Sequence, residues 1–275
     1  MRTANSVRTY SYVLLLSSLL AVSVLTAAGL LSWRAPHAVL MRGLPPSGNR
    51  LAGFPPVMLW AWERPEAVNF INPSEVGVAF LAKTIRLRGE KVIIRPRLQP
   101  LQIPKGTVLM AVTRIEVDRV EPPLFSSDQQ AQVVSAIAAL TRLSNIAALQ
   151  VDFDATASER TFYWGVLYDL RSRLPDTMGL SITALASWCL YDDWLSGLPI
   201  DEAVPMLYRM GIDRKQVLFH LEAGKEFRPS LCRQSVGIST DEPRSRLPAG
   251  RRVYVFHPRP WSEEAAHDII QEVRR

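Results

Sequence analysis

Eight short apolar runs, separated by longer amphipathic stretches, constrain the fold of this chain more than any other feature. Each run is rich in Val, Ile, Leu and Ala, which is typical of strands buried on both faces of a parallel sheet. Eight such strands in about 220 residues predict a compact (β/α)₈ TIM-type barrel, with an open doubly wound sheet as the alternative. The predicted strands are Val57–Trp62, Val76–Ala82, Val108–Ile115, Ile146–Phe153, Gly179–Ala184, Ala203–Tyr208, Ser235–Ser239 and Arg252–His257.

The amphipathic stretches between these runs predict helices. Ser158 and Ser262 supply N-terminal signals for two of them. The segment Thr84–Leu101 is different, because Arg86 to Glu90 lie between two β-rich runs, and it predicts a small hairpin inserted after the second strand. The predicted helices are Asp128–Leu143, Ser158–Leu174, Asp213–Gly224 and Ser262–Arg274.

The N-terminus carries an export signal. Residues Thr9–Trp33 contain no charge, and Arg2 and Arg8 precede them. A run of this length spans a bilayer as a helix, and the two arginines keep the N-terminus in the cytoplasm. Small residues at Thr26–Gly29 also suit a signal peptidase, so a membrane anchor and a removed signal peptide both remain open. We expect a protein anchored in the inner membrane and facing the periplasm, or one secreted to the periplasm.

Three segments follow from this pattern: residues 1–34 as signal anchor or signal peptide, 35–56 as a linker rich in Pro and Gly, and 57–275 as the barrel. The net charge of +6 is misleading, because three of the 32 basic residues lie in residues 1–34. The remaining 29 basic and 26 acidic residues leave only +3, so no nucleic-acid partner is predicted. One basic cluster, Arg244 to Arg252, is either a solvated loop or a contact for an anionic surface.

Cys189 and Cys232 are the only cysteines in the chain. An oxidising compartment makes a disulfide between them possible, and two buried free thiols are the alternative.

A row of polar side chains marks the end of the fourth predicted strand. Gln150, Asp152 and Asp154 share one face, because side chains alternate along a strand. Two carboxylates on one face shift each other's pKa values apart, which suits acid and base chemistry. Alternatively, they cap the next helix and bond neighbouring strands.

Other strand ends carry further candidates for the site, because barrel enzymes place function at these ends. Tryptophans suit stacking on sugar rings but equally suit a core, Arg114 with Glu116 forms either a site or a structural salt bridge, and a single His is often structural. The candidates are Trp60 and Trp62 on the first strand and Glu63 after it, Arg114 and Glu116 at the end of the third, Trp188 after the fifth, Tyr208 and Arg209 at the end of the sixth, and His257 at the end of the eighth.

Several motif-based functions have no support. The chain has no HExxH, GxSxG or CxxC segment and no glycine-rich phosphate loop. An Asp-x-Asp pair such as Asp152 and Asp154 lacks the further oxygen ligands that Ca²⁺ or Mg²⁺ requires. We therefore predict neither a metal nor a cofactor.

Long segments of the chain resemble an uncharacterised bacterial family, domain of unknown function 3142. The resemblance covers nearly everything from Pro56 onward and implies no activity, because that family has no established function. It rests on Val57–Pro65, Arg95–Leu101, Gln150–Ala155, Ser158–Arg160, Ser181–Cys189 and Ala203–Met210.

A more distant resemblance connects the chain to chitinase-like glycoside hydrolases, which carry DxDxE and Met-x-Tyr-Asp runs at these barrel positions. Asp152-Phe153-Asp154 and Met206-Leu207-Tyr208 are similar to those runs. The catalytic Glu of the DxDxE run is replaced by Thr156, and the Asp of the Met-x-Tyr-Asp run is replaced by Arg209. Glu159 either folds back in place of the missing Glu or begins the next helix.

These features favour an extracytoplasmic barrel that cleaves a glycosidic bond of a polysaccharide or other envelope polymer. We predict Asp154 as the acid, with Asp152 or Glu116 as its partner. The alternative is a module that binds polysaccharide or scaffolds the envelope and has lost the chemistry, as Thr156 and Arg209 suggest. A third hypothesis is an assembly factor that uses the arginine loop at the membrane surface.

Overall fold

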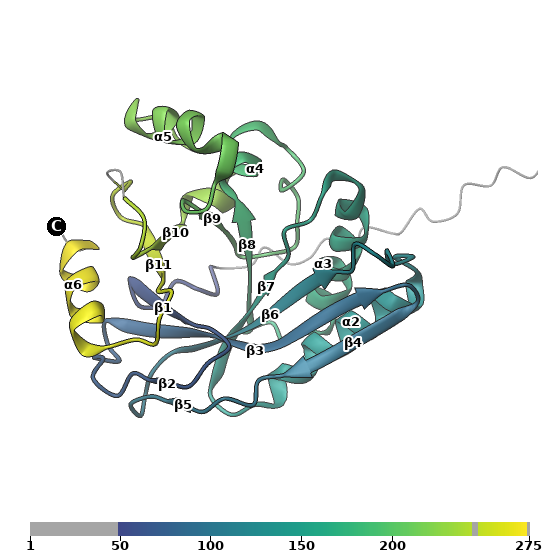
Figure 1. The fold of residues 1–275 in the computed structure, drawn as a ribbon, viewed down its shortest axis with the longest axis horizontal. Coiled ribbons are helices and arrows are strands. Elements are labelled where there is room, and N and C mark those ends of the chain that lie inside the picture. Colours follow the sequence, from purple (N-terminus) through teal and green to yellow (C-terminus); the bar gives the residue numbers. More distant parts are fainter. Residues whose placement is uncertain (1–48, 244–246, 274–275) are drawn as a thin grey trace, which may run out of the picture. The chain divides into compact units, whose positions relative to one another are not determined.

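The computed structural model describes residues 49–243 and 247–273, and its central feature is a closed barrel of eight parallel strands (Figure 1). The first strand, β1, pairs with the last strand, β11, and with β3, which closes the barrel. The predicted barrel is confirmed, and the open-sheet alternative is wrong. The barrel strands are β1 (Val57–Ala61), β3 (Val76–Arg88), β6 (Leu109–Val117), β7 (Ile146–Asp152), β8 (Gly179–Leu185), β9 (Glu202–Met206), β10 (Ser235–Ser239) and β11 (Arg252–Phe256).

The inserted hairpin is also present. Strand β4 (Lys91–Pro96) pairs antiparallel with the long end of β3, and Gly89 makes the turn with a φ of 51°. Only glycine adopts such a φ readily, which explains the sharp reversal after Arg88. Two shorter strands, β2 (Glu66–Ala67) and β5 (Leu101–Gln102), form a separate parallel pair.

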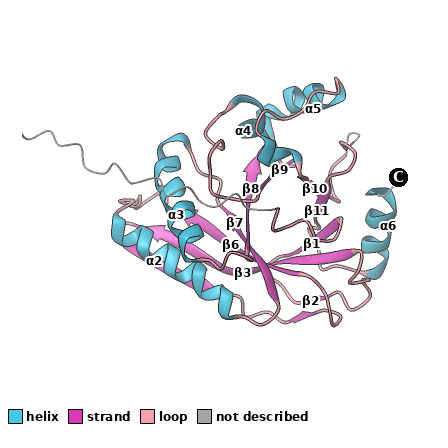
Figure 2. Cartoon of the chain, turned by 180° about the vertical axis from the view of Figure 1, so that it is seen from behind, coloured by secondary structure: helices cyan, strands magenta, loops and turns pink. Residues whose placement is uncertain are grey.

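Helices follow the later strands of the barrel. Both helices α2 and α3 flank the strands that precede them, as the view from behind shows (Figure 2). Helix α2 begins at a capping box in which Ser126 and Gln129 bond each other's backbone N–H groups, and Ser262 Oγ accepts from Ala265 at the start of α6. The helices are α2 (Ser127–Ala138), η1 (Ala139–Arg142), η2 (Ala157–Glu159), α3 (Arg160–Arg173), α4 (Ala186–Tyr191), η3 (Gly211–Asp213), α5 (Arg214–Glu222), η4 (Ser230–Arg233) and α6 (Glu263–Val273).

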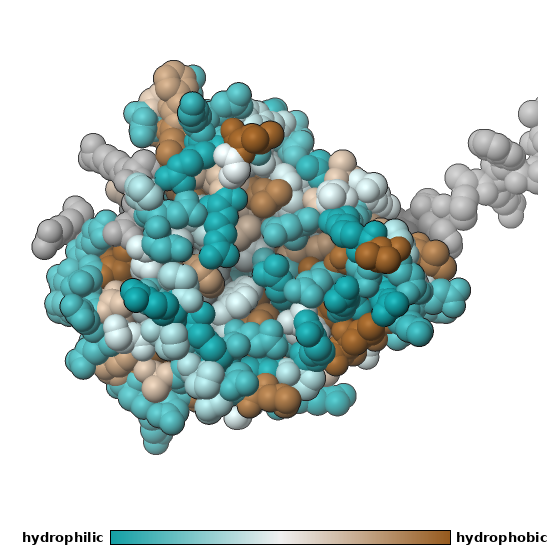
Figure 3. Space-filling view, in the orientation of Figure 1, coloured by the Kyte–Doolittle hydropathy of each residue, from teal (hydrophilic) through white to brown (hydrophobic). Residues whose placement is uncertain are grey.

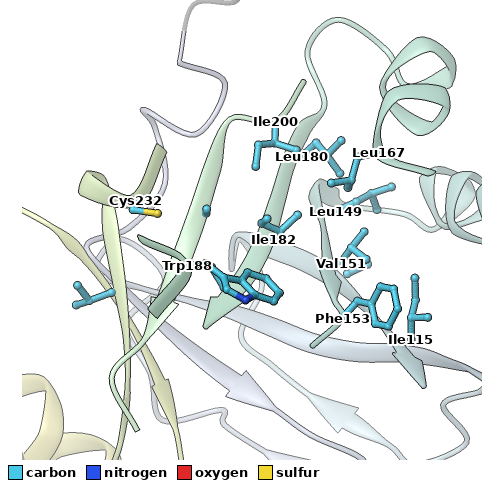
Figure 4. Packing of buried hydrophobic residues seen from close by; sticks show 14 of the residues in the cluster. Ile115, Leu149, Val151, Phe153, Leu167, Leu180, Ile182, Trp188, Ile200 and Cys232 are labelled. Carbon is cyan, nitrogen blue, oxygen red and sulfur yellow. The ribbon is translucent and has the colours of Figure 1, made fainter. Parts of the chain in front are cut away.

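Two apolar cores lie on the two sides of the barrel wall. The outer core lies between strands and helices, where Leu149, Val151 and Phe153 of the β7 segment face Leu167 of α3 (Figure 4). The inner core fills the barrel and includes Met58 and Trp60. The predicted alternation along β7 is therefore confirmed, with Gln150 and Asp152 on the other face.

Residues 49–56 pack against the barrel. Leu51 is fully buried in the inner core, and its carbonyl accepts a hydrogen bond from Arg252 at 2.5 Å. Arg50 forms an ion pair with Asp201 at 2.9 Å. These contacts fix the segment that leads into β1 beneath the N-terminal ends of the strands.

A disulfide joins Cys189 of α4 to Cys232 of η4. Of the two states left open by the sequence, the bridged one is present. The two cysteines lie 43 positions apart in the sequence, and the bridge connects the segment after β8 with the segment before β10.

The surface shown in Figure 3 is mostly hydrophilic, with hydrophobic residues in small separate groups. Within the described part of the chain, no helix has the length and apolar character needed to span a membrane. The expected membrane segment and most of the expected linker fall in residues 1–48, outside the described residues.

Candidate active site

A cavity of about 430 Å³ opens at the C-terminal ends of the barrel strands. Its walls are the ends of β1, β6, β7, β8, β9 and β11, together with the segments that follow them. Barrel enzymes place their chemistry at this end. Seven of the candidate residues line this cavity, namely Trp60, Trp62, Arg114, Asp152, Asp154, Tyr208 and Arg209.

Asp152 is the last residue of β7 and is 6% exposed. Thr183 Oγ1 donates a hydrogen bond to its Oδ1 at 2.7 Å, and Arg114 Nη1 donates to its Oδ2 at 3.3 Å. Burial raises the pKa of Asp152 to about 6, although the Arg114 guanidinium opposes the shift. The carboxyl group therefore changes its charge close to neutral pH.

Asp154 lies two residues further on, on the loop after β7. Its side chain borders the cavity and keeps contact with solvent, and no described residue donates a hydrogen bond to its carboxylate. Partial burial of the carboxyl group raises the pKa of Asp154, and the Arg114 guanidinium again opposes the shift. Asp154 is thus the carboxylate that a molecule in the cavity can reach directly.

An aromatic floor, defined here as Trp60, Trp62, Tyr208 and Phe256, lines the same cavity as the two carboxylates. The rings of Tyr208 and Phe256 stack with centroids 5.8 Å apart, and Trp62 meets Phe256 edge-on at 6.2 Å. The Nε1 of Trp60 donates to Gln150 Oε1 at 2.9 Å, which fixes the indole. Within the floor Trp60 is buried, and the partly exposed rings of Trp62, Tyr208 and Phe256 suit the apolar face of a sugar ring.

Glu116 lies in a second hollow of about 370 Å³, which borders the first at Arg114, Asp152 and Asp154. Its carboxylate forms ion pairs with Arg114 at 3.2 Å and with Arg95 at 3.7 Å. The structural salt bridge that we considered for Arg114 and Glu116 is present, while Arg114 also contacts Asp152.

Three other candidates lie away from the cavity lining. The ring of Trp188 is buried in the outer core, 4.9 Å from that of Trp194, because α4 begins at Ala186 and turns it outward (Figure 4). His257 borders a separate hollow beside α6, where Thr240 Oγ1 lies 2.6 Å from its Nδ1. Glu63 is exposed on the loop after β1.

Glu159 does not fold back toward the carboxylates. It is 3% exposed, accepts a hydrogen bond from the backbone N–H of Thr156 at 2.8 Å, and pairs with Arg119 at 2.9 Å. It therefore starts the helical segment after β7, which is the second of the two roles considered for it.

Several other residues line the cavity although they were not predicted as site residues from the sequence. Thr183 and Phe256 follow the alternation of their strands, which could have identified them. Ser187, which follows the fifth predicted strand, lines the cavity from α4. Met210 and Asp213 come from the segment after β9, and no sequence signal points to them. Among the described residues, no group of three or more His, Cys, Asp or Glu side chains is arranged to hold a metal ion.

Comparison with known proteins gives a family match for the centre of the chain. The sequence model of the family described as Domain of unknown function (DUF3142) matches residues 106–235, which confirms the predicted resemblance over this part. No curated protein matches the chain.

One solved structure that matches is the Bacillus cereus spore cortex-lytic enzyme SleL, at 17% sequence identity and a TM-score of 0.41. The match covers 66% of this chain and 50% of that one, so the chain spans about half the length of that enzyme.

Proposed function

We propose that this protein is a carbohydrate-active barrel that cleaves a glycosidic bond in the cavity at the strand ends. The observation that carries the proposal is a pair of carboxyl groups, Asp152 and Asp154, whose pKa values are both raised by burial, in a cavity that is also lined by aromatic rings. Glycosidic cleavage requires two carboxyl groups beside the bond, one of them protonated.

Within this proposal, Asp154 donates the proton to the glycosidic oxygen, because its carboxyl group is open to the cavity. Asp152, fixed by Thr183 and Arg114, is its charge partner. Their like charges disfavour double ionisation, which keeps one proton on the pair at mildly acidic pH.

The test is turnover of a panel of polysaccharides by the full chain and by Asp154→Asn and Asp152→Asn. A general acid contributes roughly 10²- to 10⁴-fold, so each variant should lose at least about a hundredfold in rate. Asp193→Asn is the control, because this carboxylate is 71% exposed and, among the described residues, forms its ion pair with Arg228 on the surface. Equal product formation by wild type and both site variants would contradict the assignment of Asp154 and Asp152 as the catalytic pair.

A second candidate function is polysaccharide binding without cleavage. It is favoured by Thr156 at the position of an expected acid, and by the hydrogen bonds that already occupy both oxygens of Asp152. In that case a polysaccharide binds the wild type and Asp154→Asn equally well, and neither protein releases products.

The proposed location is extracytoplasmic, either anchored in the inner membrane and facing the periplasm or secreted there. The disulfide between Cys189 and Cys232 supports an oxidising compartment. A fusion of the full chain to a reporter that folds only outside the cytoplasm tests this, and an inactive reporter would contradict it.

Two arginines of the cluster, Arg251 and Arg252, give little support to the third hypothesis, an assembly factor at the membrane surface, whereas Arg244 and Arg246 lie outside the described residues. Arg251 pairs with Glu226, and Arg252 pairs with Glu202 at 3.0 Å. Their side chains are 4% and 10% exposed, so these two arginines are not available to lipid head groups.

A further inference from the structure

Two guanidinium groups flank the aromatic floor of the cavity. Arg114 lies over the ring of Trp62, 6.0 Å from its centroid, and Arg209 lies over the ring of Phe256 at 5.1 Å. A cation over an aromatic ring is held in place by the ring's electrons. A sugar ring that stacks on this floor would therefore meet an arginine at either edge.

The two arginines differ in what they already bind. Arg114 is engaged by Glu116 at 3.2 Å and by Asp152 at 3.3 Å. Within the described ranges, by contrast, no carboxylate lies within ion-pair distance of the Arg209 guanidinium. Arg209 thus brings an uncompensated charge and a full set of donors to the cavity.

The backbone of Arg209 is held in an unusual conformation. Its φ of 50° lies in the left-handed region, which non-glycine residues seldom adopt. The Arg209 N–H donates to Glu242 Oε1 at 2.8 Å, and Arg214 binds the other oxygen of Glu242 at 2.6 Å. Such a conformation persists only where surrounding contacts enforce it, and here they direct the side chain over Phe256.

The contact with Phe256 also places the guanidinium of Arg209 at the β11 side of the cavity, although Arg209 itself follows β9. The barrel order β1-β11-β10-β9-β8-β7-β6-β3 places β11, which carries Phe256, directly across the barrel from β7, which carries Asp152. An anionic group at the Phe256 edge of the floor would therefore lie away from the acidic pair.

We infer that Arg209 forms a subsite for the carboxylate of a uronic acid, so that the bound polysaccharide is an acidic one. The inference rests on the proposed carbohydrate site and names its substrate class. The sugar ring stacks on the aromatic floor, and the guanidinium binds the carboxylate through two parallel hydrogen bonds. A neutral sugar leaves this charge unpaired.

Binding measurements test the inference with defined probes: alginate, polygalacturonate and hyaluronan, each beside its carboxyl-reduced derivative. The full chain carries Asp154→Asn in every arm, so that cleavage does not consume the probe. We expect at least one acidic polymer to bind roughly tenfold more tightly than its reduced form, as one charge-assisted contact provides. Arg209→Gln should remove this preference, so that the variant binds the acidic polymer and its reduced form equally.

Arg209→Lys should keep part of the preference, because it retains the charge but loses the two-pronged geometry. Lys and Gln carry a Cβ as Arg does, so backbone strain is the same in all three. Arg142→Gln, at an exposed position in η1, is the matched control and should keep the full preference.

Equal binding of every acidic polymer and its reduced form overturns the inference, as does a preference that survives Arg209→Gln or a failure of all acidic probes to bind. These results are distinct from failure of the proposed function. Cleavage of neutral polymers without acidic preference removes the uronate subsite alone. An Arg209-dependent preference without any turnover by the wild type removes the hydrolase alone.

Discussion

Buried polar side chains inside the barrel form a connected chain of hydrogen bonds below the candidate site. Gln150 links Trp60 to Ser181, and Ser181 donates to Glu202 at 3.1 Å. Glu202 also accepts from Tyr254 at 2.5 Å and pairs with Arg252. Each charged or amide side chain in this hydrogen-bond network has a partner, as burial requires. Asp152, on the same face of β7 as Gln150, has only a partly exposed arginine as its counter-charge, which is why burial dominates its pKa.

The raised pKa of Asp152 predicts a pH-dependent stability. Because the folded-state pKa is about 6 and the unfolded value is 3.8, the folded protein binds the proton more tightly. The contribution of Asp152 to the free energy of unfolding is fully present below the unfolded pKa. It is lost as pH rises through about 6, and the total loss is about 3 kcal/mol. Urea unfolding at pH 4 to 7.5 measures it as the difference between wild type and Asp152→Asn.

A companion variant tests the cause of this shift. Arg114→Gln removes the cation that opposes burial, so the pKa of Asp152 should rise above its wild-type value, as carboxyl ¹³C NMR would detect. Arg142→Gln should leave it unchanged. A pKa of Asp152 near 4 in the wild type would contradict the electrostatic account.

Gly237 on β10 makes room for Trp60 at the base of the cavity. A Cβ at this position would lie 2.8 Å from Cη2 of the buried indole, which is held by Gln150. Gly237→Ala should therefore lower the free energy of unfolding by about 1–3 kcal/mol, as overpacking does, and shift the tryptophan fluorescence. Gly53→Ala, where no heavy atom lies within 4 Å, is the control and should stay within about 0.5 kcal/mol. No change in Gly237→Ala would mean that the indole is free to move.

At the scale of elements, the sequence predicts long regular segments well and the segments that follow the strands poorly. All eight barrel strands and the alternation of Leu149, Val151 and Phe153 follow from apolar periodicity, because burial on both sides of the wall imposes it. Periodicity does not say where a strand stops and a short helix begins. Trp188 was therefore expected at a strand end, although α4 starts at Ala186 and carries it into the outer core. Asp213 reaches the cavity for the same reason, through the helical segment η3, which is too short to leave a pattern.

The disulfide fixes one of these short elements. Helix α4 has six residues, fewer than a stable isolated helix needs, and Cys189 ties it to η4. A bridge that closes 43 residues stabilises by about 4 kcal/mol on the loop-entropy estimate. Cys189→Ser with Cys232→Ser should lower the free energy of unfolding by up to that amount, measured in urea. The reducing agent dithiothreitol should lower wild-type stability but leave the double variant unchanged. Equal stability of oxidised and reduced wild type would refute this role.

At the scale of the whole molecule, the two ends of the barrel serve different purposes. The C-terminal ends of the strands surround an open cavity with charged groups, whereas the opposite end is closed by residues 49–56. Residues 49–56 are bound to the last strand, β11, because Arg252 of β11 donates hydrogen bonds to the carbonyls of Leu51 and Pro55. The segment before β1 is therefore part of the folded barrel and contributes to its core.

This closure predicts that Leu51 is essential for stability although it precedes the first strand. Leu51 is fully buried within the inner core, and its Cδ2 borders Gly179 of β8 so closely that no Cβ would fit there. Leu51→Ala should lower the free energy of unfolding by about 2–5 kcal/mol, as buried Leu to Ala changes do. The matched control is Leu98→Ala, at a side chain 86% exposed, which should change it by less than about 0.5 kcal/mol. If chemical denaturation finds the two variants equally stable, residues 49–56 rest on the barrel without closing it, and the inner core ends at the strands themselves.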